Sequence, residues 1–213
     1  MIKKQNYLKH AIVLFLLLLL MQPERAWAAY ENVEFSSLTN HDGLTNSQVG
    51  AILKDTRGYI WFGTQSGLCR FDGFRMKTFY YSNTDDKSLP NNSVDELQQD
   101  YDGNIWVHTS VGYSIYKYDE EQFERKPEEW LKNIHVQGPP YKLLIDKDKN
   151  MWIAVYGQGL FFHNAKTKNT YLFKFTKKAQ PGCLKEGNIS KITEVDGDAL
   201  ITYGDGTICR VNG

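Results

Sequence analysis

The sequence has no excess charge of either sign. Its 213 residues include 25 lysines and arginines and 25 aspartates and glutamates. The basic residues are scattered along the chain, whereas nucleic-acid-binding proteins gather them on one face or along one helix. The composition therefore predicts a protein that does not bind nucleic acid.

Cysteine is also scarce, since the chain contains only Cys69, Cys183 and Cys209. Three cysteines cannot all pair within one chain, and their spacing resembles neither a zinc nor a redox motif. A Cys183–Cys209 disulfide remains open in an oxidising compartment. Buried thiols are the favoured interpretation, because free cysteine packs like a small apolar residue. We predict no metal and no cofactor.

Long apolar runs are absent except near the start of the chain. Residues 11–21 form an apolar run that follows three lysines, and Ala26 and Ala28 supply small residues at the positions read by a signal peptidase. The run is shorter than the roughly 20 residues that a spanning helix needs. Residues 1–28 are therefore interpreted as a secretory signal peptide, with an uncleaved anchor as the alternative, and the chain is predicted to be exported.

Aromatic residues and glycines, by contrast, are numerous and spread along the chain. There are 13 tyrosines, 11 phenylalanines, 5 tryptophans and 17 glycines. Aromatic residues favour strands and glycines favour turns. Because long periodic apolar stretches are few, this composition excludes an all-helical fold and predicts many short strands.

A repeat of about 45 residues is the most informative feature of the sequence. The first two copies match at many positions, and the third follows with one inserted residue. A fourth copy, from Ile189 to Val211, is weaker and has Leu200 where tryptophan stands in the others. The repeated structural positions are Asp55, Gly58, Trp61 and Gly67 in the first copy, Asp100, Gly103, Trp106 and Gly112 in the second, and Asp146, Trp152 and Gly159 in the third.

Each copy is predicted to form four antiparallel strands separated by tight turns. A lone four-stranded sheet exposes two apolar faces, so the copies must stack on one another, and roughly 40–50 residues per four strands is typical of a β-propeller blade. The recurring tryptophan is interpreted as packing between blades rather than as a surface for stacking sugars. In the first copy the predicted strands are Val49–Lys54, Tyr59–Gly63, Leu68–Phe71 and Met76–Tyr81.

The motifs closely resemble the two-component regulator propeller repeat. The resemblance lies in residues 46–49, 55–64, 67–72 and 88–94, and it weakens in the third copy, where Asn150 is interpreted as replacing the turn glycine. It implies the periplasmic sensor part of a hybrid two-component histidine kinase that is anchored in the inner membrane. Many members of that family sense oligosaccharides, and their blades form seven-bladed rings.

The predicted fold is all-β, with about four blade units that are an incomplete part of a seven-bladed ring. Seven blades need about 315 residues at about 45 residues each, so the chain is interpreted as the first portion of a longer protein; a complete four-bladed ring is the competing possibility. The predicted divisions are 1–28 signal peptide, 29–46 N-terminal strand closing a propeller, 47–91 blade 1, 92–138 blade 2, 139–187 blade 3 and 188–213 partial blade 4.

Catalytic chemistry is not predicted for this chain. No histidine lies in the helical setting that a phospho-accepting group of a kinase needs, and no glycine-rich nucleotide loop follows. Residues 100–104 and 146–150 imitate the start of a calcium loop but lack its glycine and its bidentate glutamate, so their aspartates are interpreted as turn formers. The segment 120–140 interrupts the repeat, and its Trp130 is expected either to pack on its own blade or to form an exposed stacking surface.

The function expected from these features is sensing, with an oligosaccharide as the ligand. Other expected partners are the remaining blades or a second propeller of the parent protein, and a second copy of the parent in a homodimer. An exported propeller that acts only as a protein-interaction scaffold is the alternative. The repeat marks blades rather than ligand contacts, so no ligand-binding residue is predicted.

Overall fold

The computed structural model describes residues 36–175, 184–185 and 187–212. The chain divides into two units, Met1–Ser37 and Leu38–Gly213, and every strand described below lies in the second. The predicted signal peptide lies outside the described residues. No helix within the described ranges is long and apolar enough to cross a membrane.

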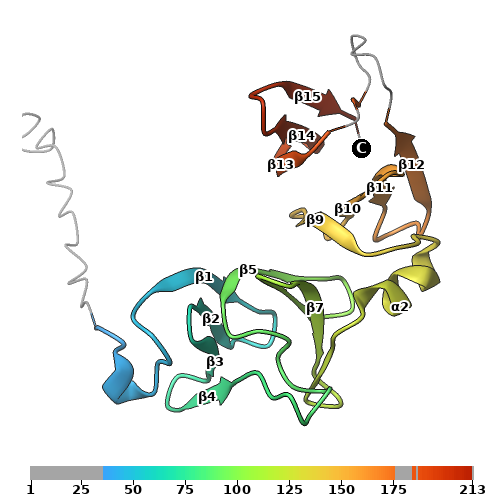
Figure 1. The fold of residues 1–213 in the computed structure, drawn as a ribbon. Coiled ribbons are helices and arrows are strands. Elements are labelled where there is room, and N and C mark those ends of the chain that lie inside the picture. The colour runs from blue at the N-terminus through green and yellow to red at the C-terminus, as the bar shows by residue number, and fades with distance from the viewer. Residues whose placement is uncertain (1–35, 176–183, 186, 213) are drawn as a thin grey trace, which may run out of the picture. The chain divides into compact units, whose positions relative to one another are not determined.

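Four antiparallel sheets follow one another in chain order (Figure 1), and in each sheet consecutive strands are neighbours. Sheet 1 consists of β1 (Val49–Lys54), β2 (Ile60–Thr64), β3 (Gly67–Phe71) and β4 (Met76–Phe79), and sheet 2 of β5 (Val94–Gln99), β6 (Ile105–Thr109), β7 (Gly112–Lys117) and β8 (Gln122–Glu124). Sheet 3 consists of β9 (Pro140–Ile145), β10 (Met151–Val155), β11 (Gly159–His163) and β12 (Thr170–Lys174), and sheet 4 of β13 (Ile189–Val195), β14 (Asp198–Tyr203) and β15 (Ile208–Val211).

The predicted all-β class and its blade units are confirmed by these sheets, and the strands of the first copy lie where the sequence pattern places them. The closure of a seven-bladed ring and the exact blade boundaries stay predictions.

The hydrophobic core is divided into clusters that lie between neighbouring sheets. One cluster joins sheets 1 and 2, a second joins sheets 2 and 3, and a third joins sheets 3 and 4. Trp61, Trp106 and Trp152 each belong to a different one of these clusters, and their exposed fractions are 0%, 1% and 0%. The tryptophans therefore fill the space between blades, as predicted, and none of the three rings is available to stack on a sugar.

Polar side chains also join neighbouring sheets. Gln99, on β5, accepts a hydrogen bond from the backbone N–H of Thr56 in sheet 1 at 3.0 Å. Glu194, on β13, accepts one from the backbone N–H of Lys147 in sheet 3 at 3.0 Å. Thr56 and Lys147 each directly follow a repeated aspartate. The two junctions therefore use the exposed backbone N–H group at the equivalent position of the turn.

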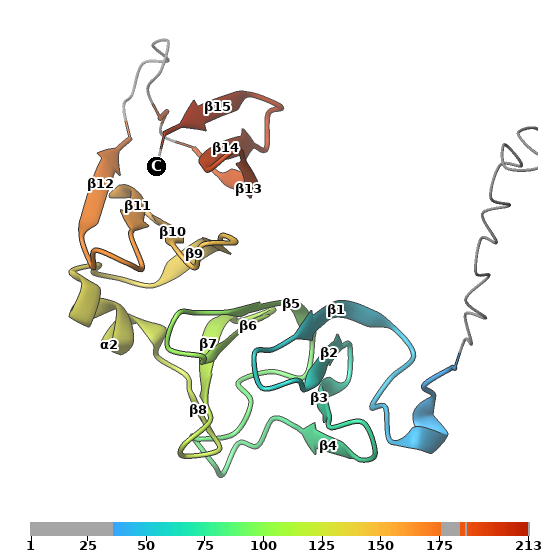
Figure 2. The ribbon, with the colours of Figure 1, turned by 180° about the vertical axis from the view of Figure 1, so that it is seen from behind.

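The segment between sheets 2 and 3 contains a short helix, α2 (Pro127–Leu131), followed by the 3-10 turn η2 (Lys132–Ile134). Figures 1 and 2 show α2 between the two sheets from opposite sides. Proline at the first helical position and two glutamates in the first turn favour a helix start here. Trp130 packs edge-on against Trp106 with ring centroids 5.4 Å apart. It therefore packs on the core of sheet 2 and is not an exposed stacking surface.

The outer face of sheet 1 is covered by the residues that precede β1. The 3-10 turn η1 (Asn40–Asp42) has a capping box, in which the Thr39 hydroxyl and the Asp42 carboxylate satisfy backbone N–H groups. Leu44 then packs with Phe62 and Cys69, so the Cys69 thiol is buried as predicted. Residues 36–39 form no strand. The N-terminal strand that closes a propeller is predicted to pair with a blade beyond this chain, so its formation stays a prediction. Cys183 lies outside the described residues.

Candidate functional site

The repeated aspartates form the turns between the first two strands of their sheets. The Asp55 carboxylate accepts hydrogen bonds from the backbone N–H groups of Arg57 and Tyr59 at 2.9 and 3.0 Å. It also accepts one from the indole Nε1–H of Trp61 at 2.7 Å and one from the Tyr118 hydroxyl of sheet 2. One buried carboxylate thus holds the turn, the core tryptophan and the next sheet together.

Asp100 repeats this arrangement in sheet 2. It accepts hydrogen bonds from the backbone N–H groups of Asp102 and Asn104 and from Trp106 Nε1 at 2.9 Å. Burial raises the pKa of the Asp100 carboxyl above its ordinary value, although the hydrogen bonds from Trp106 and Asn104 act in the opposite direction. These donors are what make a buried carboxylate tolerable at this position.

The third copy keeps the turn but loses the link to tryptophan. Asp146 accepts from the backbone N–H and the side-chain amide of Asn150, at 2.9 and 3.0 Å. Trp152 Nε1 is buried and has no hydrogen-bond partner among the described residues. The interpretation of Asn150 as the substitute for the turn glycine is wrong. The left-handed residue of the turn lies three places after the aspartate. This residue is Gly58 in the first copy, with φ +92°, and Lys149 in the third, with φ +65°.

Both calcium-like segments are therefore aspartate turns, since Asp100 and Asp146 bind backbone N–H groups. Within the part of the chain that the structure describes, no three His, Cys, Asp or Glu side chains gather in a group suited to a metal ion.

The repeated glycines at the start of the third strands have positive φ. Gly67, Gly112 and Gly159 have φ of +136°, +114° and +149°. At Gly159 a Cβ atom would lie 2.2 Å from the carbonyl oxygen of Phe173 on the paired strand β12. This position therefore requires glycine for close strand pairing. All the repeated residues thus act in the architecture of the blades.

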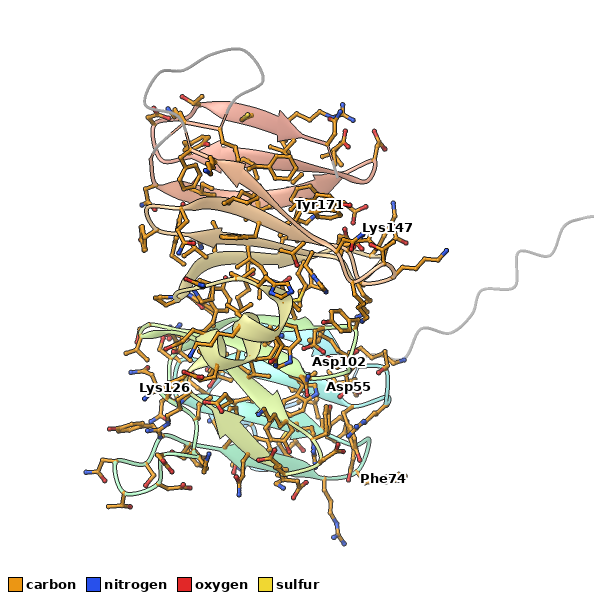
Figure 3. All side chains as sticks on the ribbon, turned by 90° about the vertical axis from the view of Figure 1, so that its right-hand side faces the viewer. Asp55, Phe74, Asp102, Lys126, Lys147 and Tyr171 are labelled. Carbon is orange, nitrogen blue, oxygen red and sulfur yellow. The ribbon has the colours of Figure 1, made fainter. Side chains whose placement is uncertain are left out.

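The other end of the sheets carries a cleft. Figure 3 shows Asp55, Asp102 and Lys147, which belong to the aspartate turns, on one side and Lys126 on the opposite side. Beside Lys126, a cleft of about 480 Å³ is lined by residues of sheets 2 and 3 and of the segment that connects them. The aromatic or charged side chains in its lining are His108, Tyr113, Arg125, Glu128, Tyr141 and Tyr156.

The aromatic side chains of the cleft are held in fixed positions. Tyr141 and Tyr156 stack with ring centroids 4.0 Å apart and an interplanar angle of 19°. The Tyr113 hydroxyl accepts a hydrogen bond from the backbone N–H of Leu143 at 3.1 Å and donates to Glu96 at 3.2 Å. Burial, and then the negative charge of Glu96, raises the pKa of Tyr113. Tyr113 is therefore a neutral hydroxyl that joins sheet 2 to sheet 3.

Arg125 lines the cleft and fixes the backbone of the loop that follows β4. Its guanidinium donates to the carbonyl oxygens of Ser88, Ser82 and Asp85 at 2.9, 2.9 and 2.8 Å. His108 Nδ1 lies 2.6 Å from an oxygen of Asp95. Sequence reasoning did not find these residues, because they lie outside the repeated positions; the interruption of the repeat at residues 120–140 was the available signal.

Stacked antiparallel blades, three of them four-stranded in the described residues, with a buried tryptophan at each junction define this protein as a β-propeller protein in class. The family described as "Two component regulator propeller" matches residues 43–66 and 88–110. These two stretches are two-component regulator propeller repeats, which confirms the resemblance seen in the sequence.

Comparisons with individual proteins agree with this family. Over 61 residues, or 29% of this chain, the sequence is 41% identical to histidine kinase P4 of Formosa agariphila, of which it covers 4%. The extracellular domain of a hybrid two-component system from B. thetaiotaomicron has a similar fold, with a TM-score of 0.58, 23% identity, and coverage of 83% of this chain and 25% of that one. The extracellular domain of a one-component system from the same organism has a TM-score of 0.51 and 18% identity, and the match covers 80% of this chain and 24% of that one.

The chain therefore spans about a quarter of the length of these solved domains and a small part of the kinase. At these identities the two structures establish a shared fold.

Proposed function

We propose that this chain is an exported sensor segment of a hybrid two-component histidine kinase. The observation that carries the proposal is the match of two repeats, built as packed blades, to a propeller family of two-component regulators. The fold shared with extracellular domains of two-component and one-component systems supports it.

In this proposal the segment contributes to binding an oligosaccharide. Binding changes the conformation of the segment, and this conformational change is transmitted to the rest of the parent protein. The chain itself catalyses no reaction. Its other partners are further blades or a second propeller of the parent, and the parent forms a homodimer in the inner membrane. The stacked sheets suit this role because each sheet packs against the next through a continuous apolar cluster. A displacement of one blade therefore also displaces the side chains of the neighbouring blade.

An antibody raised against residues 38–212 provides the first test, by measuring the native mass in envelope fractions of the source organism. A band on the order of 100 kDa or more is expected, because sensor and signalling domains share one chain. A band near or below 24.6 kDa contradicts the kinase link and favours an exported scaffold that binds another protein.

A signalling reporter provides the second test. Deletion of residues 38–212 from the full parent is expected to abolish the response to oligosaccharide while the parent still reaches the envelope. A response that survives this deletion overturns the proposed sensing role.

A further inference from the structure

The cleft between sheets 2 and 3 has the size of a small-ligand site. Its volume of about 480 Å³ lies within the usual range of such sites, roughly 300–1,000 Å³, and corresponds to about two or three sugar rings. Its lining combines tyrosines and prolines with a few charged groups. Flat apolar faces next to hydrogen-bonding groups match a sugar, which has an apolar ring face and hydroxyls around its edge.

Tyr156 presents an oriented and accessible ring in this cleft. It lies in the turn between β10 and β11, and 66% of its surface is exposed. The ring nevertheless stacks on Tyr141, which packs against the core between sheets 3 and 4. An exposed aromatic ring that is already held by a half-buried neighbour loses little conformational entropy on binding.

The charged groups favour a neutral ligand over an acidic one. Of the two lining side chains that can carry positive charge, His108 is paired with the Asp95 carboxylate, and Arg125 directs its Nε–H and Nη2–H groups to backbone carbonyls of residues 82–89. Glu128 lines the cleft as well and is only partly exposed, and its carboxylate forms no hydrogen bond or ion pair with another described residue. A free carboxylate accepts hydrogen bonds from hydroxyls and repels an anion.

We propose that this cleft binds a neutral oligosaccharide, with the Tyr156 ring stacking on a sugar ring and the Glu128 carboxylate accepting hydrogen bonds from its hydroxyls. The inference rests on the proposed sensing function and locates its ligand site on this chain. The repeated aspartates and tryptophans then build the blades, while the residues between the repeats bind the ligand.

Isothermal titration of the full chain tests the site. The probes are cellotetraose, xylotetraose and arabinotetraose as neutral oligosaccharides and tetragalacturonate as the acidic one. At least one neutral probe is expected to bind, and to bind more tightly than tetragalacturonate. The Tyr156→Ala variant should weaken that binding about tenfold or more, equivalent to about 1.4 kcal/mol, whereas Tyr156→Phe keeps the ring and should stay within about threefold of the original chain.

Matched variants separate the cleft from the rest of the surface. Glu128→Gln is expected to weaken binding of the neutral probe severalfold and to strengthen binding of tetragalacturonate, because the repelling charge is gone. Tyr171→Ala, which removes an exposed tyrosine on β12 outside the cleft, should change neither. Thermal unfolding of each variant verifies that the fold is intact.

Three results overturn the site: no neutral probe binds, tetragalacturonate binds most tightly, or Tyr156→Ala leaves the affinity of the neutral probe unchanged. These outcomes leave the sensing function standing if the parent's reporter still responds to oligosaccharide through residues 38–212. Loss of the reporter's dependence on residues 38–212 refutes the sensing function itself.

Discussion

At the scale of single residues, the repeated aspartate contributes differently from one blade to the next. Asp55 accepts from Trp61 and from Tyr118 of the neighbouring sheet, whereas Asp146 accepts from its own turn and leaves Trp152 Nε1 without a partner among the described residues. The same residue type at the same repeat position therefore contributes different interaction energies in different blades.

This difference predicts unequal effects of the same substitution. Asp55→Asn should lower the free energy of unfolding by about 1–3 kcal/mol, because its amide group faces buried donors that need an acceptor. Asp146→Asn should lower it less, because Trp152 gives up no bond there. Urea unfolding of both variants measures the difference, and equal losses would contradict the role assigned to the Asp55–Trp61–Tyr118 link.

His163 is a buried titratable residue with a defined tautomer. Its Nδ1 lies 2.8 Å from the Thr170 hydroxyl, which donates its own proton to the carbonyl oxygen of Ile134 at 2.7 Å. Nδ1 must therefore donate, and Nε2 is left without a partner among the described residues. Burial, followed by the charge of Lys168, lowers the pKa of His163, while Asp102 acts in the opposite direction.

The sign of this shift predicts acid sensitivity. A histidine whose folded pKa is lowered stabilises the fold fully above the unfolded value of about 6.5, and that stability is lost as the pH falls below it. Between pH 7.5 and 5.5 the original chain should therefore lose more unfolding free energy than His163→Gln. The exposed His41→Gln serves as the control and should behave like the original chain; identical pH dependence in all three would refute the prediction.

At the scale of elements, close strand pairing depends on glycine unequally. Gly159 and Gly112 occupy the same repeat position and both have positive φ, but a Cβ at Gly159 would meet a backbone oxygen of β12 while a Cβ at Gly112 has no neighbour within 4 Å. A side chain at either position would strain the backbone, but only a side chain at Gly159 would also clash with the neighbouring strand.

Gly159→Ala should therefore destabilise the chain more than Gly112→Ala. We expect about 1–3 kcal/mol of strain at either position and an additional loss at Gly159 from displaced β11–β12 pairing. Thermal unfolding ranks the variants, and hydrogen exchange of β12 amides shows where pairing is lost. Equal losses would show that backbone strain alone decides, and a larger loss in Gly112→Ala would contradict the clash assigned to Gly159.

A β-bulge recurs in the first strand of all four sheets and helps to form the cleft. It lies between Val49 and Ala51 in β1, between Val94 and Glu96 in β5, between Pro140 and Lys142 in β9, and correspondingly in β13. In β5 the bulged residue is Asp95, whose carboxylate reaches His108 at the cleft. Bulges redirect a side chain at the end of a ladder, and the alternation of residues along a strand does not reveal them.

At the scale of the whole molecule, the clusters join each sheet only to its neighbours in chain order. Stability in such a stack is approximately a sum of local units and nearest-neighbour interfaces. Trp152→Ala removes a large buried side chain from the cluster between sheets 3 and 4, and about 3–5 kcal/mol is typical of such a loss.

Hydrogen exchange should therefore show a graded response. In Trp152→Ala, amides of sheets 3 and 4 should lose protection while those of sheets 1 and 2 keep it, and Trp61→Ala should show the reverse. Uniform loss of protection in both variants would mean that the four sheets unfold as one cooperative unit.

The sequence by itself determined the blade architecture. The spacing of aspartate, glycine and tryptophan specifies turns and strands locally. A tryptophan repeated on the second strand of the first three units has to be buried between sheets, because a single sheet leaves it exposed. The short helix α2 and the role of Trp130 were left open, because the interrupted segment has no periodic pattern to specify its structure.

Only the tertiary structure decided where the cleft proposed as the ligand site lies. Tyr156, Glu128 and His108 come from a turn, a connecting helix and a neighbouring sheet, and none of them occupies a repeated position. Their proximity arises because stacking of successive sheets brings the end of sheet 2 next to the start of sheet 3. Packing between blades is a long-range outcome, so residues that meet through it share no spacing in the sequence.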